Sequence, residues 1–275
     1  MSTARAVRRE IVAWMADPEA PNPGNPIHSG SGARAYGVAA ALVGGVHVYG
    51  FAVGAILDAL GHDWLEHGFA ELEFRRPVYP SERLWVSVGA DGTLTVYAAD
   101  DDVRLRGRVG LGDAPWRDEL VRPTRVTPEA PASPRPRLAP ENVPVGADLR
   151  ARAVHLAHDE MERFCREKQN EQLACFYGRD AFAHPAWIAG QPIHLLHHSF
   201  DYGPAVHTAS RIQHVRAVRN GETVVVAGSC VDAFERKGHH YIVNDCVLLD
   251  REGRTLTQLR HTAIYRLAAP AGGQS

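Results

Sequence analysis

The sequence predicts an α+β protein built from two similar halves, each a long apolar helix followed by antiparallel strands. Three observations predict this arrangement. A proline-rich segment divides the chain near its middle, each half contains one apolar stretch with helical spacing, and strand-like stretches follow each of these. We expect a first repeat over residues 1–120, a linker over 121–146, a second repeat over 147–268 and a tail over 269–275.

The linker is predicted from its proline content. The segment from Val121 to Gly146 contains seven prolines and almost no large apolar side chains. Proline lacks an amide donor and fixes the backbone angle φ, so this segment can form neither an inner strand nor a helix. We therefore expect an extended connection between the two repeats.

The first half is predicted to contain a central helix over Gly45–Gly61. Apolar residues recur in it at helical spacing and cover nearly all of its sides, which is typical of a helix wrapped by a sheet. Strand-forming residues bounded by turn residues predict the strands that follow it. These strands are Phe69–Phe74, Leu84–Val88, Leu94–Ala98 and Arg104–Leu111.

The second half repeats this pattern with a helix predicted over His184–Phe200. Pro185 suits the first turn of a helix. Pro192 lies inside the helical pattern, so we expect it to kink or shorten the helix. Turn residues such as Asn220-Gly221 separate the strands that follow. These strands are Ala205–Val218, Thr223–Phe234, Tyr241–Leu249 and Leu256–Tyr265.

Composition and charge exclude several classes of protein. The chain has 275 residues, of which 45% are hydrophobic and 23% charged, which is typical of a globular protein and not of a disordered one. Its formal net charge is -2, so there is no excess of basic residues to hold nucleic-acid phosphates. We therefore expect no nucleic-acid partner.

Cysteine usage and hydropathy indicate a cytoplasmic protein. The four cysteines form no C-x-x-C pair, which favours reduced thiols over a disulfide scaffold or a zinc ribbon. No apolar core segment follows the arginines in Met1–Glu10, so we expect no signal peptide. The longest apolar run, Val38–Leu60, is interrupted by glycines, His47 and Asp58, so we expect no membrane span.

Short motifs in both halves resemble those of one known family. In the first half they are Asn25-Pro26-Ile27-His28, Gly44-Gly45-Val46-His47 at the helix start, and the segment Leu72–Tyr79. In the second half they are Val206-His207-x-x-Ser210 and the turn Glu235–His239. Together they resemble the MaoC-like family of R-specific enoyl-thioester hydratases and dehydratases, in its double hot-dog form.

The resemblance implies a fold, a substrate and a reaction. Two hot-dog repeats would bind an acyl thioester of CoA or acyl carrier protein, in fatty acid or polyketide metabolism. The reaction would be the reversible hydration of a trans-2-enoyl thioester to the R-3-hydroxyacyl thioester. No metal or redox cofactor is expected, because acid–base groups and oriented amides suffice. The open edges of a hot-dog sheet would also allow a homodimer.

Two alternatives to the hydratase stay open at this stage. An acyl-thioester hydrolase could use the same fold, with water attacking the carbonyl carbon. The chain could instead be a non-catalytic subunit that binds acyl thioesters. The departure of one residue from the family pattern allows the second alternative, because the family's catalytic Asp would fall at Pro23, which cannot ionise.

The first candidate site precedes the first helix. His28 is the candidate base, because an imidazole titrates near neutral pH. Asn25 would hold the loop or the attacking water, although Asn-Pro is also an ordinary way to start a turn. The helix start at Gly45, His47 and Val48 would supply amide donors that polarise the thioester carbonyl.

A second candidate pair precedes the second helix. Asp180 and His184 have nearly the spacing of the family's Asp and His, so the catalytic pair could belong to this half. Their alternative role is to cap the helix and fix its first turn. Arg76 is a candidate contact for a CoA phosphate. Three histidines of the second helix share one face, where we expect a polar surface and no metal site. They are His194, His197 and His198.

Overall fold

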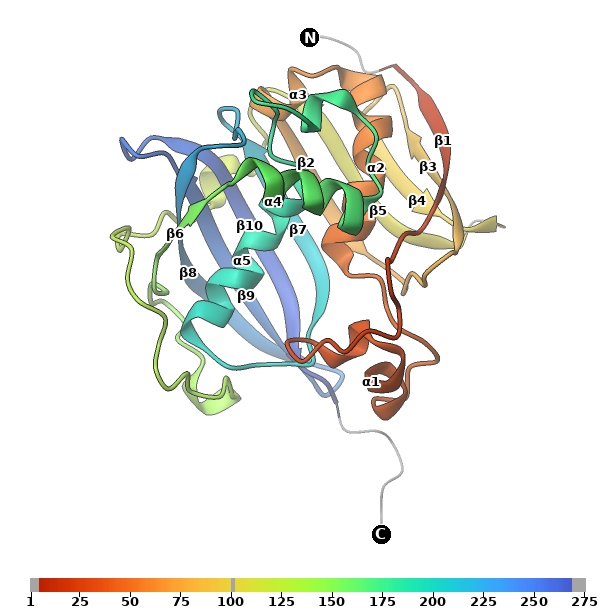
Figure 1. Cartoon of the computed structure of the whole chain (residues 1–275). Coiled ribbons are helices and arrows are strands. Elements are labelled where there is room, and N and C mark those ends of the chain that lie inside the picture. The colour runs from red at the N-terminus through yellow and green to blue at the C-terminus, as the bar shows by residue number, and fades with distance from the viewer. Residues whose placement is uncertain (1–4, 100–101, 269–275) are drawn as a thin grey trace.

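One antiparallel sheet of ten strands organises the chain (Figure 1). The computed structural model describes residues 5–99 and 102–268, so the predicted tail lies outside the described residues. The strand order is β1-β3-β4-β5-β2-β7-β10-β9-β8-β6. The strands are β1 (Val7–Val12), β2 (Gly68–Phe74), β3 (Arg83–Val88), β4 (Thr93–Tyr97), β5 (Val103–Leu111), β6 (Arg152–His155), β7 (Val206–His214), β8 (Thr223–Arg236), β9 (His239–Leu249) and β10 (Thr255–Arg266).

The two halves meet where β2 pairs with β7 at the centre of the sheet. The first half supplies one side of the sheet and the second half the other, so the two repeats form one continuous surface (Figure 1). Inward-facing side chains of both strands are buried, as shown by Ala70 and Leu72 on β2 and Ile212 on β7. Burial of this apolar surface holds the two repeats together.

Two long helices lie against the same face of the sheet (Figure 1). Helix α2 (Gly45–Leu60) covers the first half, and α5 (Pro185–Ser199) covers the second. The side chains of α2 are buried on nearly all sides, which explains its apolar sequence. The shorter helices are α1 (Gly30–Ala35), α3 (Trp64–His67) and α4 (His158–Arg163), with a π-helical segment at Phe164–Gln169 and 3₁₀ turns at Pro26–His28, Arg117–Glu119, Pro140–Asn142 and Ala174–Phe176.

The predicted α+β class and the repeated helix-then-strands order are confirmed. Two strands were not predicted from the sequence, β1 and β6, which form the outer edges of the sheet. Pro192 does not shorten α5, which continues to Ser199, so that part of the expectation was wrong. Pro192 is buried, so packing of its ring offsets the hydrogen bond that its missing amide would have made.

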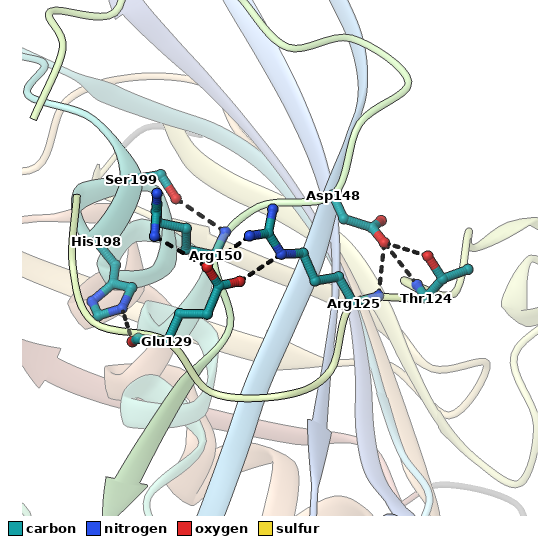
Figure 2. A network of polar contacts seen from close by, with 7 residues as sticks. All are labelled: Thr124, Arg125, Glu129, Asp148, Arg150, His198 and Ser199. Atoms are coloured by element: carbon teal, nitrogen blue, oxygen red, sulfur yellow. Dashed lines mark hydrogen bonds and ion pairs between the residues drawn. The ribbon is translucent and has the colours of Figure 1, made fainter.

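The linker lies along the second half and is anchored by side chains (Figure 2). The carboxylate of Asp148 accepts hydrogen bonds from the amides of Thr124 (2.9 Å) and Arg125 (2.8 Å). The carboxylate of Glu129 pairs with Arg125 (2.6 Å) and Arg150 (3.0 Å). These contacts fix a segment whose prolines leave it few backbone donors.

No helix within residues 5–99 and 102–268 has both the length and the apolar character needed to cross a membrane. The four cysteines, which the sequence analysis assigned as reduced, carry free thiols.

The two central helices touch at Gly50 of α2. A Cβ atom placed on Gly50 would lie 2.9 Å from the Cβ of Ala186 in α5 and 2.1 Å from Oε1 of Gln169. In α5, by contrast, a Cβ atom on Gly190 would meet no atom within 4 Å. The close approach of the helices therefore depends on the missing side chain at Gly50.

This contrast yields a prediction with a matched control. Gly50→Ala should destabilise the fold by about 1–3 kcal/mol, because the added methyl overpacks the contact between the helices. Gly190→Ala should be neutral or stabilising by up to about 1 kcal/mol, because alanine favours the helix and finds open space. Urea denaturation of both variants measures the difference, and equal stabilities would show that the helices do not meet at Gly50.

Candidate functional site

Asn25 connects the loop before α2 to the second half of the chain. Its side-chain Oδ1 accepts a hydrogen bond from the amide of Ala205 (3.1 Å), and its Nδ2 donates to the carbonyl of Ala205 (2.8 Å). Ala205 immediately precedes β7, the strand of the second half that pairs with β2. These two backbone contacts fix the orientation of the amide, and Nδ2 also contacts Nε2 of His28 at 3.0 Å.

His28 is held as a neutral imidazole with its lone pair on Nε2. Its Nδ1 lies 2.7 Å from the carbonyl oxygen of Leu42. A carbonyl can only accept, so Nδ1 carries the proton and Nε2 accepts from Asn25. Burial lowers the pKa of His28 below its usual value, against the opposing effect of the Leu42 hydrogen bond. His28 is partly exposed as a residue, and a neutral imidazole is the protonation state that a general base requires.

The start of α2 lies directly against this imidazole. A Cβ atom placed on Gly44 would lie 3.5 Å from Cε1 of His28, which is an ordinary van der Waals distance, so the ring lies close to the backbone at the helix start. Gly44 is the N-cap residue, and no side chain caps the helix. The amides of Gly45 and Val46 make no hydrogen bond within the described part of the chain. Such free amides at a helix start can bind an oxygen on which negative charge develops.

Two amides that the sequence analysis assigned to the thioester oxygen are already used. The amides of His47 (2.9 Å) and Val48 (3.1 Å) both donate to the carbonyl of Gly44. This corrects the predicted role of His47 and Val48, because each amide satisfies the first turn of the helix. Gly45 remains a candidate donor, and Val46 takes the place of the other two.

The side chain of His47 forms a wall of the site. Gln169 Nε2 donates to its Nδ1 at 2.6 Å. Burial lowers the pKa of His47 to about 3, and the neighbouring His28, Lys168 and His184 add to this shift because each would repel a charged His47 when it is itself protonated. His47 therefore stays neutral beside His28 and does not serve as an acid at neutral pH.

A histidine of the second half lies on the other side of the helix start. A Cβ atom placed on Gly45 would lie 2.9 Å from Nδ1 of His207. Nε2 of His207 donates to the carbonyl of Ala209 (3.1 Å) and lies 2.7 Å from the hydroxyl of Ser210. Nδ1 therefore carries a buried lone pair, which has no hydrogen-bond partner among the described residues.

Sequence reasoning named His207 only as part of a motif and assigned it no role. The structure brings it to the site through the pairing of β2 with β7, which no local pattern reveals. Burial and the neighbouring His261 lower the pKa of His207 well below its usual value. The Gly44-Gly45 pair thus lies between two neutral imidazoles, one from each half.

The candidate pair Asp180 and His184 is not formed as expected. Asp180 is exposed, and the carboxylate near His184 belongs to Glu171, with Oε2 at 3.5 Å from Nε2. Nδ1 of His184 accepts from the amide of Ala186 (3.1 Å) and caps α5. The ring is fully buried, so His184 has the surroundings of a structural residue, which was the alternative assigned to it.

Arg76 and His198, which the sequence analysis also singled out, form contacts with other parts of the chain. Arg76 is exposed and pairs with Asp102 at 2.5 Å. Nε2 of His198 donates to the backbone carbonyl of Glu129 at 2.9 Å. Within residues 5–99 and 102–268, no three His, Cys, Asp or Glu side chains are grouped so that they could hold a metal ion.

No described carboxylate forms a hydrogen bond or ion pair with His28. Pro23, at the position of the family's Asp, is exposed. The two nearest acids in the sequence are engaged elsewhere, because Asp17 accepts from the amide of Glu19 (3.0 Å) and Glu19 pairs with Arg34 (3.5 Å). The site therefore consists of imidazoles, the Asn25 amide and free backbone amides.

Comparisons with known proteins identify the fold. No protein-family model matches the chain, and no curated protein matches its sequence. A protein assigned as a MaoC-domain dehydratase from Chloroflexus aurantiacus superposes with a TM-score of 0.58 at 12% identity, covering 98% of this chain and 97% of its own. A Mycobacterium tuberculosis protein with a double hot-dog fold gives a TM-score of 0.59 at 14% identity and covers 96% of both chains.

A protein assigned as an oleoyl thioesterase from Lactobacillus plantarum gives a TM-score of 0.50 at 11% identity, covering 96% of this chain and 98% of its own. The shared architecture thus extends to one protein assigned as a dehydratase and to another assigned as a thioesterase. Identities this low establish the architecture alone. The resemblance seen in the sequence motifs is confirmed at that level: this chain has the double hot-dog fold of the MaoC-like dehydratases.

Proposed function

We propose that this protein is an acyl-thioester hydratase or dehydratase acting reversibly on a trans-2-enoyl thioester of CoA or acyl carrier protein. The observation that carries the proposal is the neutral imidazole of His28 against the free amides of Gly45 and Val46. A base and an oxyanion site are the two elements that this reaction requires. The reaction is redox-neutral and proceeds with groups of the chain alone. We place the protein and its carrier-bound substrate in the cytoplasm.

Hydration can proceed with His28 as the single acid–base group. Nε2 takes a proton from water while the water oxygen bonds to C3 of the substrate. The electron pair of the C2–C3 double bond shifts towards the thioester carbonyl, whose oxygen becomes negative. The imidazolium then returns its proton to C2, and the hydroxyl stays on C3. This route needs no carboxylate, which agrees with the exposed proline at position 23.

Asn25 positions the water in this proposal. Its side-chain amide is fixed by Ala205, and its Nδ2 donates a hydrogen bond to Nε2 of His28. A water that takes this place would contact Asn25 and His28 together. The amides of Gly45 and Val46 would hold the thioester oxygen, and donors of this kind contribute about 10²–10³ to the rate.

One observation favours a second candidate, thioester hydrolysis. The absence of a carboxylate on His28 among the described residues leaves the site without a separate acid for C2, whereas hydrolysis needs only a base and an oxyanion site. Crotonyl-CoA distinguishes the two reactions. Loss of enoyl absorbance indicates hydration, release of a free thiol indicates hydrolysis, and binding with neither signal indicates a non-catalytic subunit.

Replacement of the proposed base tests the assignment directly. His28→Ala should lower kcat/KM for crotonyl-CoA hydration by about 10²–10⁴, because the base is removed while the oxyanion donors remain. His62→Ala is the matched control, since His62 is an exposed histidine of the same half, and it should leave kcat/KM unchanged. Full activity in His28→Ala would refute the proposed role.

The pH dependence follows from the direction of the His28 pKa. Burial lowers this pKa below 6.5, and the neutral imidazole is the active form. The hydration kcat/KM should therefore be constant above pH 7 and fall about tenfold per pH unit below the lowered pKa. A stopped-flow pH profile measures this, and an activity that rises on acidification below pH 6 would contradict it.

We expect replacement of His184 to lower the stability of the fold and to leave the reaction unaffected. His184→Ala removes the α5 cap and the partner of Glu171, which should cost about 1–3 kcal/mol of unfolding free energy. Asp180→Ala, at an exposed side chain, should change stability by less than about 0.5 kcal/mol. Urea denaturation tests both. If folded His184→Ala loses turnover at unchanged stability, the reaction depends on the second half.

A further inference from the structure

A pocket of about 540 Å³ lies between the linker, the edge strand β6 and the last turns of α5. The linker contributes Glu129 and Arg135, β6 contributes Arg152, and α5 contributes His194 and His197. The volume falls in the range of small-molecule sites, roughly 300–1,000 Å³. None of these side chains belongs to the site around His28.

Two guanidinium groups in the pocket have no acidic partner within the described residues. Arg152 is half-buried and forms no ion pair or hydrogen bond there, and burial lowers the pKa of its guanidinium. Arg135 donates only to the backbone carbonyl of His197, at 3.0 Å. A half-buried guanidinium without a counter-ion is unfavourable, so an anion in the pocket would stabilise Arg152, and the exposed guanidinium of Arg135 offers a second donor to the same anion.

The carboxylates around the pocket are already neutralised. Glu129 pairs with both Arg125 (2.6 Å) and Arg150 (3.0 Å), as Figure 2 shows. Asp201, whose charge acts to raise the pKa of His197, pairs with Arg137 at 3.1 Å. The pocket therefore keeps an excess of positive charge with free hydrogen-bond donors.

The C-terminal end of α5 repels an anion in the pocket only weakly. Its last carbonyls accept hydrogen bonds from the linker. The carbonyl of His197 accepts from the guanidinium of Arg135, and the carbonyl of His198 accepts from the amide of Ala132 at 3.0 Å. These contacts satisfy the oxygens that would otherwise carry the negative end of the helix dipole. The ring of His197 is stacked on Tyr202 with centroids 4.1 Å apart, which fixes one wall of the pocket.

We propose that this pocket binds a phosphate-bearing small molecule of nucleotide size. Planar guanidinium groups match the oxygens of a phosphate in two-point contacts. A single phosphate would leave most of the volume empty, whereas a nucleotide would also contact the imidazoles of His194 and His197. The proposal does not depend on the reaction assigned to His28. The phosphate can belong to a free nucleotide or to the nucleotide part of CoA.

Calorimetric titration with 3′,5′-ADP tests the site without turnover. We expect saturable binding that weakens as salt is raised, because the contacts are ionic. Arg152→Gln and Arg135→Gln should each raise the Kd about tenfold or more. Arg83→Gln removes the same charge from β3, far along the sheet in strand order, and should leave the Kd unchanged.

The outcomes distinguish a free nucleotide from the nucleotide part of CoA, and they also show whether the proposal fails. Competition between CoA and 3′,5′-ADP would assign the pocket to the nucleotide of CoA, and simultaneous binding would assign it to a separate ligand. A thermal melt of each variant confirms that it is folded. If Arg152→Gln does not fold, the affinity of Arg152→Lys is measured in its place. Failure of the unmodified protein to bind 3′,5′-ADP, or equal affinity in all variants, would overturn the proposal.

Discussion

The pairing of β2 with β7 is the contact on which the rest of the structure depends. It joins two repeats into one sheet and sets the register of the second half against the first. The same register carries Ala205 to the side chain of Asn25, and it carries His207 to the start of α2. A shift of this pairing by one residue would turn the β7 side chains, including His207, to the opposite face of the sheet. The site is therefore a property of the joined halves.

Chemistry is favoured at His28 over His184 because of what each ring nitrogen contacts. His28 uses Nδ1 for a backbone carbonyl and keeps a lone pair on Nε2, which accepts a hydrogen bond from the side-chain amide of Asn25. His184 uses its lone pair to cap α5 and directs its proton towards Glu171. Two histidines in equivalent places of the repeats thus differ, since the lone pair of one faces the side chain of Asn25 and the lone pair of the other stabilises a helix.

Local sequence was sufficient where local forces determine the structure. The apolar stretch at Gly45–Leu60 and the strands of the second half were predicted because burial imposes their periodicity. The edge strands β1 and β6 were missed because no residue in either is fully buried, so neither carries the buried apolar alternation of the inner strands. Asn25 and His28 could be named from a motif. The partners of the site, Ala205 and His207, could not, because they arrive through pairing of distant strands.

The linker shows how composition determines a surface that no motif reveals. Its prolines remove backbone donors, so charged side chains such as Arg125 and Glu129 must attach it to the second half. Glu129 is paired with Arg125 and Arg150, Asp148 is satisfied by the amides of Thr124 and Arg125, and Arg135 and Arg152 remain without an acid among the described residues. Neutralising the acids while leaving these arginines free produces a positive pocket. The requirement to anchor a proline-rich segment thus accounts for both the polar network and the anion site that lies beside it.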